Sequence, residues 1–162
     1  MLWTAIHLPS LPLQVFLRAT PSSKPVVIDE GSRVLACNQC ANTLGVKPGM
    51  RTSAALALAS SLRICSRDQV AEIRALKGIA AWAQQFTPMS SLAPPNSVLL
   101  EIGGCLNIFQ GLNKLTRRVH SGLSNLGYDN VAIATAPTSS GALLLAQAGR
   151  ETQLTTLPHR IR

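Results

Sequence analysis

Apolar residues recur along the chain at two spacings, one typical of strands and one typical of helices. The apolar segment 2–8, which ends at Pro9, is typical of a short strand. From Val70 to Trp82 apolar residues recur every three or four positions, which predicts a long helix over 69–86. The same patterns predict further strands at 25–29, 32–36, 98–102 and 131–136, and further helices at 11–19, 38–44, 53–61, 112–126 and 139–148.

Capping and turn residues mark the ends of these elements. Ser53 and Asp68 are predicted N-caps, because their side-chain oxygens can accept hydrogen bonds from the first free backbone N–H groups of a helix. Gly127 is a predicted C-cap. The proline-containing segment 88–95 is predicted to be a loop.

The order of the predicted elements favours an α+β fold. The second half of the chain reads strand, helix, strand, helix, and the first strand lies far from it in sequence. A mostly helical stretch separates the two. This order fits a sheet that is interrupted by an insertion better than it fits a doubly wound parallel sheet.

Composition limits the classes to which the protein can belong. Its 162 residues are about one domain's worth, and the 46% share of hydrophobic residues excludes a disordered basic tail. Fifteen Lys and Arg against seven Asp and Glu give a net charge of +8, which suits an attraction to phosphate groups. No segment reads as a membrane span and the N-terminus lacks the features of a secretory signal. We therefore expect a cytoplasmic protein without a membrane partner.

Two of the four cysteines, Cys37 and Cys40, form a C-x-x-C pair. A zinc site would need two further Cys or His residues at matching spacing, and a thioredoxin-like motif would open a helix after a strand. Buried thiols are the simpler interpretation, and a role for the pair stays open.

Several segments together resemble the Y-family of translesion DNA polymerases. NQCANTLGVKPGM at 38–50 resembles the fingers of that family, where an Ala-rich helix leads into G-V-x-x-G-M. IHLP at 6–9, LLEIGGCLNIFQG at 99–111 and AIATAPTSSGALLLAQAG at 132–149 are most similar to its ImuB-like branch. The similarity is spread over nearly all of the chain, and the order and spacing of the motifs carry it.

The resemblance implies a fold and a domain organisation. It implies a ferredoxin-like palm sheet with helices on one face, interrupted by a small, mostly helical fingers subdomain. The palm-like part would be 1–12 plus 77–162 and the fingers-like part 13–76. The thumb and little finger of the family would be absent, so we expect a fragment of a longer protein.

The resemblance also locates the functional positions of the family. In active members the first strand ends in an Asp that binds both catalytic metals, and this position falls on His7. The Asp-Glu pair that completes the metal site falls on Asn96 and Ser97. The Tyr and Arg that hold the incoming triphosphate fall on Gln39 and Asn42. We therefore expect no catalytic residue, no nucleotide site, no metal and no cofactor.

The resemblance implies a catalytically inactive scaffold in bacterial translesion synthesis and damage-induced mutagenesis. Its partners would be DNA, a RecA-like ImuA-type protein, a DnaE-type error-prone polymerase and, through a region beyond this chain, the sliding clamp. Two alternatives stay open. One is an active or nucleotide-binding polymerase with an atypical site for Mg²⁺, and the other is a DNA-binding α+β module without polymerase ancestry.

Basic residues are the candidates for contact with the DNA backbone, because Lys and Arg neutralise phosphate charge. Solvated helix or loop surface is the competing interpretation of each. The candidates are Arg33, Lys47, Arg51, Arg63, Lys114, Arg117 and Arg118.

Overall fold

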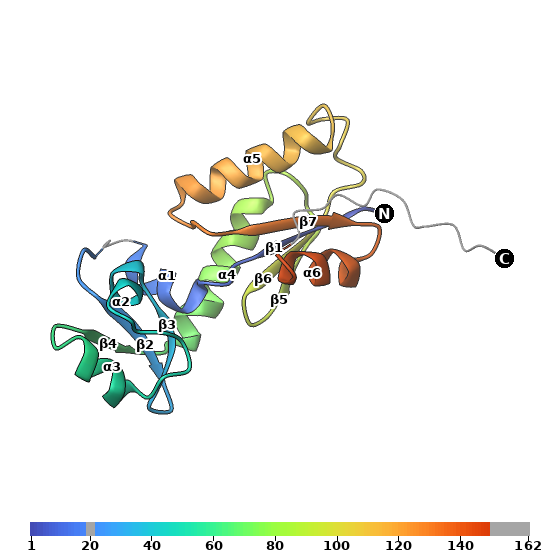
Figure 1. Ribbon diagram of the computed structural model, residues 1–162. Coiled ribbons are helices and arrows are strands. Elements are labelled where there is room, and N and C mark those ends of the chain that lie inside the picture. The colour runs from blue at the N-terminus through green and yellow to red at the C-terminus, as the bar shows by residue number, and fades with distance from the viewer. Residues whose placement is uncertain (19–21, 150–162) are drawn as a thin grey trace. The chain divides into compact units, whose positions relative to one another are not determined.

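The computed structural model describes residues 1–18 and 22–149, and Figure 1 shows their arrangement as a mixture of helices and strands. The described residues form two compact units: unit 1 holds residues 1–9 and those from 73 on, and unit 2 holds residues 10–72. The strands are β1 (Trp3–His7), β2 (Val26–Glu30), β3 (Arg33–Cys37), β4 (Arg63–Ser66), β5 (Ser90–Ala93), β6 (Ser97–Glu101) and β7 (Ala132–Ala136). The helices are α1 (Leu11–Leu17), α2 (Gln39–Thr43), α3 (Thr52–Leu58), α4 (Gln69–Ala83), α5 (Leu112–Asn125) and α6 (Ser139–Gln147).

Unit 1 is built on a four-stranded sheet with the strand order β5-β6-β1-β7. Every neighbouring pair in it is antiparallel. The first strand of the chain therefore lies between two strands from its second half, as the α+β prediction requires. Thr4 and Thr135 share a buried hydrogen bond of 2.8 Å between their hydroxyl oxygens on neighbouring strands.

Alanines line one face of this sheet and let α6 approach closely. A Cβ added to Gly141 of α6 would lie only 3.3 Å from the Cβ of Ala136. Figure 1 shows α5 and α6 on opposite sides of the sheet, so helices cover both of its faces. The reason is that both faces are apolar and buried, and both need cover. The buried cluster on the α6 side is Ala5, Ala134, Ala136, Ala142 and Ala146.

Unit 2 contains a three-stranded sheet of order β3-β2-β4, in which β3 is antiparallel and β4 parallel to β2. The side chain of Asn38 holds the start of α2: its Oδ1 accepts from the N–H groups of Ala41 and Val26, each at 3.0 Å. Small and branched residues make the core of the unit. They are Val27, Val34, Ala41, Val46, Ala55, Ala59 and Leu62.

The α+β fold class is confirmed, and most predicted elements lie within a few residues of the observed ones. Asp68 caps α4 as predicted, since its Oδ1 accepts from the Ala71 N–H at 2.9 Å. Ser53 does not cap α3, which begins one residue earlier, because the Thr52 backbone N–H bonds the Ser32 carbonyl and its hydroxyl bonds Asp29. The predicted loop 88–95 contains strand β5, which pairs with β6.

No helix among the residues that the structure describes is long and apolar enough to cross a membrane. The division into a palm-like part, 1–12 plus 77–162, and a fingers-like part, 13–76, stays a prediction.

Candidate functional site

The central strand β1 ends at His7, directly opposite the first residue of β6. His7 pairs with Ser97 on one side and with Ala132 of β7 on the other. The imidazole Nδ1 and the Ser97 Oγ share a hydrogen bond of 2.9 Å. Ser97 is fully buried, whereas His7 is half-buried. The structure thus brings together two of the positions on which the resemblance places metal ligands of active polymerases.

The third of those positions, Asn96, lies beside the same strand end. Its backbone carbonyl accepts a hydrogen bond of 2.9 Å from the N–H of Leu8, which extends the β1–β6 pairing by one step. His7, Asn96 and Ser97 therefore form one cluster at the junction of β1 and β6. The resemblance implied only that metal ligands of active members fall on these three positions.

Burial sets the charge state of this cluster. It lowers the pKa of His7, because the imidazolium is poorly solvated there. The side chains of Ser97 and Asn96 carry no charge at any physiological pH. The cluster is accordingly neutral, and its donor atoms are an imidazole nitrogen, a hydroxyl and an amide.

In the described part of the chain no three His, Cys, Asp or Glu side chains lie close enough together to hold a metal ion. Glu101, at the other end of β6, accepts hydrogen bonds from the backbone N–H groups of Leu2 and Gly103, at 3.0 and 3.1 Å. Its carboxylate therefore fixes the turn after β6 and is occupied there.

The two positions on which the resemblance places triphosphate contacts lie in unit 2. Gln39 and Asn42 are both in α2 and both exposed. Neither is charged, so neither can give a phosphate the strong charge-assisted hydrogen bond that an Arg gives.

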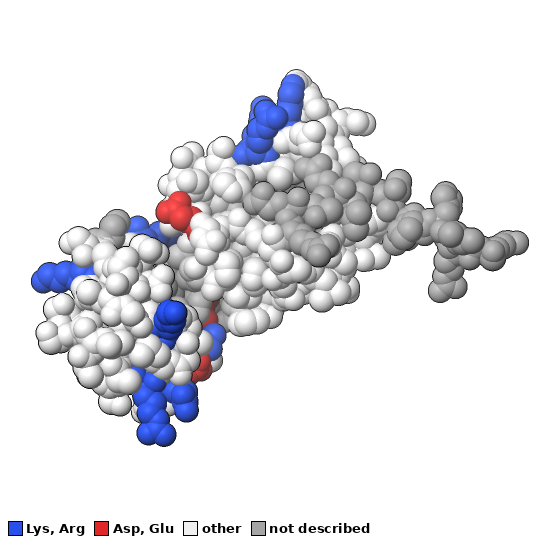
Figure 2. All heavy atoms as spheres, in the orientation of Figure 1, with Lys and Arg blue, Asp and Glu red and all other residues white. Residues whose placement is uncertain are grey.

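The seven basic candidates fall into two groups, one in each unit. In unit 2, Arg33 and Arg51 are brought together as partners in an isolated antiparallel bridge, and Arg33 Nη1 donates to the Gly49 carbonyl at 2.9 Å. Lys47 and Arg63 are exposed in the same unit. The second group, Lys114, Arg117 and Arg118, is exposed on α5 of unit 1. Figure 2 shows basic side chains over α5 with no acidic side chain among them on that face.

The C-x-x-C pair lies at a strand-to-helix junction, since Cys37 ends β3 and Cys40 lies in α2. Both thiols are free and half-buried. The Cys37 Sγ donates to the Val46 carbonyl and the Cys40 Sγ to the Ser23 carbonyl. Burial raises the pKa of Cys37, which disfavours the reactive thiolate.

A cleft in unit 1 between α4 and α5 was not predicted from the sequence. In the sequence Trp82 is the last residue of the helical repeat of apolar positions, and in the structure it lines this cleft together with Phe109 and Arg118. The sequence signal was the pair Trp82 and Phe86, four positions apart within the acid-free segment 73–100. Which side of the helix the rings would line depends on tertiary packing.

Comparison with known proteins identifies the family. The sequence model of the impB/mucB/samB family matches residues 6–147. The fold is that of the palm and fingers of Y-family DNA polymerases: a post-insertion binary complex of Dbh DNA polymerase superposes with a TM-score of 0.74 at 19% identity, over 99% of this chain and 50% of that one. A Dbh ternary complex gives a TM-score of 0.70 at 21% identity, over 91% and 45%. A DinB family error-prone DNA polymerase from Sulfolobus solfataricus gives 0.65 at 20% identity, over 99% and 48%.

The chain belongs to the impB/mucB/samB family and is a Y-family polymerase-like domain. It spans about half the length of the solved polymerases that it matches. No curated protein sequence matches it significantly. The predicted membership of the Y-family is thereby confirmed, and the narrower ImuB-like assignment stays a prediction.

Proposed function

We propose that this chain is the palm-and-fingers part of a catalytically inactive, ImuB-like polymerase homologue. It would act as a scaffold or adaptor in bacterial translesion synthesis and damage-induced mutagenesis. The observation that carries the proposal is the neutral cluster of His7, Asn96 and Ser97 at the end of the central strands. The resemblance places the metal-binding carboxylates of active members at these positions.

The donor atoms of this cluster do not fit the Mg²⁺ ions that the family implies. Mg²⁺ prefers hard oxygen ligands and is usually held through carboxylates, whereas an imidazole nitrogen suits softer metals. Two-metal phosphoryl transfer also needs carboxylate charge to offset that of the two ions. His7 and Ser97, moreover, already bond each other.

The incoming nucleotide would also lack its charged contacts. Gln39 and Asn42 stand where active members hold the triphosphate with a Tyr and an Arg, and α2 contains no cationic residue between Gln39 and Thr43. This supports the proposal that the chain has kept the fold of a polymerase without the charged contacts that bind the triphosphate.

DNA and other replication proteins are the partners in this proposal. The Dbh structures similar to this chain include binary and ternary complexes of a DNA polymerase. The basic residues of unit 2, with Arg33 and Arg51 side by side, are among the candidates for contact with the DNA backbone. The proposed protein partners are an ImuA-type RecA-like protein, a DnaE-type polymerase and, through a region outside this chain, the sliding clamp.

Calorimetric titration of the chain with a deoxynucleoside triphosphate, with and without Mg²⁺, tests the proposal. We expect no heat of binding in either condition. Dbh polymerase serves as the positive control. Metal-dependent binding in the micromolar range would contradict the proposal and favour the alternative, a nucleotide-binding polymerase with an atypical metal site.

A variant with restored carboxylates helps to interpret a titration that gives no heat of binding. His7→Asp combined with Asn96→Asp and Ser97→Glu returns carboxylates to the three positions at the β1–β6 junction. If the family geometry is retained, this variant is expected to bind Mg²⁺ where the natural chain does not. Failure of a well-folded variant to gain Mg²⁺ would mean that the three positions are misassigned.

A further inference from the structure

A cleft of about 530 Å³ opens on unit 1 between α4 and α5. Aromatic rings from Trp82, Phe86 and Phe109 form its apolar wall, and Arg117 and Arg118 stand on its α5 side. It shares no residue with the cluster at the ends of β1 and β6.

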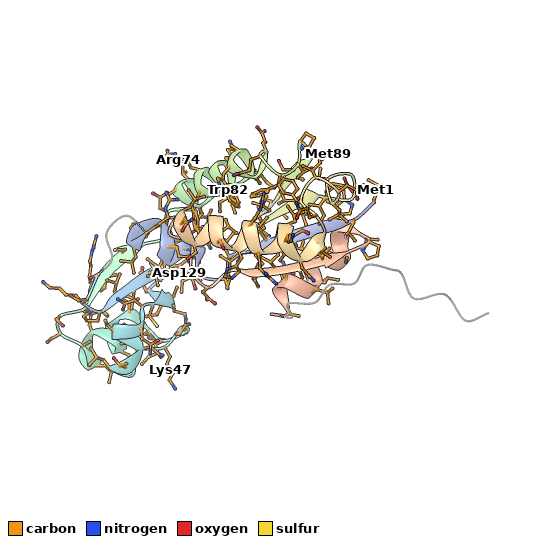
Figure 3. The ribbon with its side chains drawn as sticks, turned by 90° about the horizontal axis from the view of Figure 1, so that it is seen from above. Met1, Lys47, Arg74, Trp82, Met89 and Asp129 are labelled. Atoms are coloured by element: carbon orange, nitrogen blue, oxygen red, sulfur yellow. The ribbon has the colours of Figure 1, made fainter. Side chains whose placement is uncertain are left out.

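The aromatic wall is held in place by close packing. The rings of Trp82 and Phe86 meet edge to face at 5.1 Å, and those of Phe86 and Phe109 lie 5.6 Å apart. A Cβ on Gly122 would come within 2.2 Å of a Trp82 ring carbon, so this ring rests directly on the backbone of α5. Figure 3 shows Trp82 between α4 and α5. The wall is therefore formed before any ligand arrives, which lowers the entropic cost of binding.

The cleft presents positive charge without a matching acid. The Arg118 guanidinium carbon lies 5.7 Å from the centre of the Phe109 ring, and the side chain of Arg117 is exposed beside it. The cleft is built from segments 73–100 and 102–128, neither of which contains an Asp or Glu. Within the part of the chain that the structure describes, no ion pair joins Arg117 or Arg118 to an Asp or Glu.

We propose that this cleft binds an acidic peptide segment of a partner protein. An apolar side chain of the peptide packs against the aromatic wall of the cleft, and flanking carboxylates pair with Arg117 and Arg118. Arg is well suited to this role, because its guanidinium binds a carboxylate through two parallel hydrogen bonds. Arg and aromatic residues are also the types that most often dominate binding energy at protein interfaces.

The ring arrangement favours a peptide over nucleic acid. Single-stranded nucleic acid binds to aromatic residues by stacking bases on open ring faces. Phe86 is only 6% exposed, one face of Phe109 lies under Arg118, and Trp82 rests on Gly122. The ring edges remain available for contact, with Arg117 and Arg118 beside them. This arrangement suits an apolar side chain with carboxylates next to it.

Fluorescence polarisation of labelled peptide pools, titrated with the full chain, tests this proposal. The main pool carries Phe, Leu or Trp at its centre and Asp or Glu on both sides. One matched pool has Asn and Gln flanks, and another has Ser at the centre. We expect saturable binding of the main pool, and binding of both matched pools weakened by about tenfold or more.

Charge-reversal variants locate the binding. Arg117→Glu with Arg118→Glu is expected to weaken binding of the main pool by about tenfold or more. Arg74→Glu with Lys77→Glu makes the same change in charge at exposed positions of α4 that do not line the cleft, and is expected to leave the affinity within about twofold. Circular dichroism checks that both variants fold.

Three results would overturn the proposal. The first is that the main pool binds no better than the matched pools or not at all. The second is that both double variants weaken binding equally, which would indicate attraction by net charge alone. The third is that labelled duplex DNA, and not the acidic pool, binds in a manner that depends on Arg117 and Arg118, which would return these residues to the DNA-backbone role.

Discussion

His7 and Ser97 are direct partners across the β1–β6 pair, and the His7 Nδ1 lies 2.9 Å from the Ser97 Oγ. Ser97 is buried and His7 is half-buried. At the strand end where the resemblance places the metal-binding carboxylates of active members, this chain therefore has a hydrogen bond between two neutral side chains. The hydrogen bond joins the two strands, and we expect protonation of His7 to change the stability of the protein.

The lowered pKa of His7 predicts a stability that decreases in acid. The unfolded chain takes up the proton near the ordinary value of 6.5, whereas the folded chain takes it up only at lower pH. The contribution of His7 to the free energy of unfolding is therefore complete above pH 6.5 and declines as the pH falls below it towards the folded-state pKa. Urea unfolding on both sides of this pH measures the effect.

The control for this prediction is substitution of one histidine at a time. His7→Asn should remove part of the loss of stability in acid, because no imidazole is left to titrate there. His120→Asn changes an exposed residue of α5 and should leave the loss as it is in the natural chain. Equal acid sensitivity in the natural chain and in His7→Asn would rule out this role for His7.

Asn38 is predicted to be one of the most sensitive positions of unit 2. Its side chain bonds the N–H groups of Val26 and Ala41 and donates to the Lys24 carbonyl at 2.8 Å. Asn38→Ala removes an N-cap and leaves the buried N–H of Val26 without a partner, so the expected loss is about 2–4 kcal/mol. Asn38→Asp keeps both accepting bonds and should lose less. Chemical denaturation of the two variants compares them directly.

Local signals in the sequence predicted most of the fold. The helical spacing from Val70 to Trp82 belongs to α4, and the Asp68 cap is where the pattern placed it. Such features depend on residues close in sequence, so no tertiary information is needed to find them. The helix nevertheless ends at Ala83, three residues before the predicted Phe86.

Features that depend on distant partners were not predictable in this way. The segment Ser90–Ala93 is short and flanked by prolines, and it becomes a strand only because β6 lies beside it. The hydrogen bond between His7 and Ser97 depends on a register between residues 90 positions apart. The resemblance named both residues, but neither their contact nor the cleft at Trp82 follows from motif or spacing.

Arg67 joins two acids of unit 2, and its removal is predicted to be costly. It meets both oxygens of Glu72 at 2.9 and 3.0 Å and also reaches Glu30. The hydrogen bond with Glu72 is the main reason that the pKa of Arg67 is raised. The Glu72 side chain is only 3% exposed, so Arg67→Met leaves a buried carboxylate unpaired at a cost of about 3–5 kcal/mol.

A double variant separates the effect of the Arg67–Glu72 ion pair on stability from the effect of the packing around it. Arg67→Met with Glu72→Met removes both charges and is expected to recover most of the stability lost in the single variant. Glu30→Gln should cost less than about 1 kcal/mol, because the Glu30 side chain is 46% exposed. Thermal unfolding of these variants gives the comparison. A double variant as unstable as Arg67→Met alone would show that the buried charge is not the cause.

Two helical glycines make a matched pair for testing how tightly α4 and α5 pack. Gly122→Ala in α5 would place a Cβ within 2.2 Å of the Trp82 ring, and displacing that ring is expected to cost about 1–3 kcal/mol. Gly78→Ala in α4 meets no atom within 4 Å, so it should stabilise the helix by about 0.5–1 kcal/mol. Urea unfolding followed by circular dichroism measures both. Because Trp82 lines the cleft, Gly122→Ala should also weaken binding of the acidic peptide pool, whereas Gly78→Ala should not. If Gly122→Ala were neutral in both assays, the ring would not be held against α5 as the structure has it.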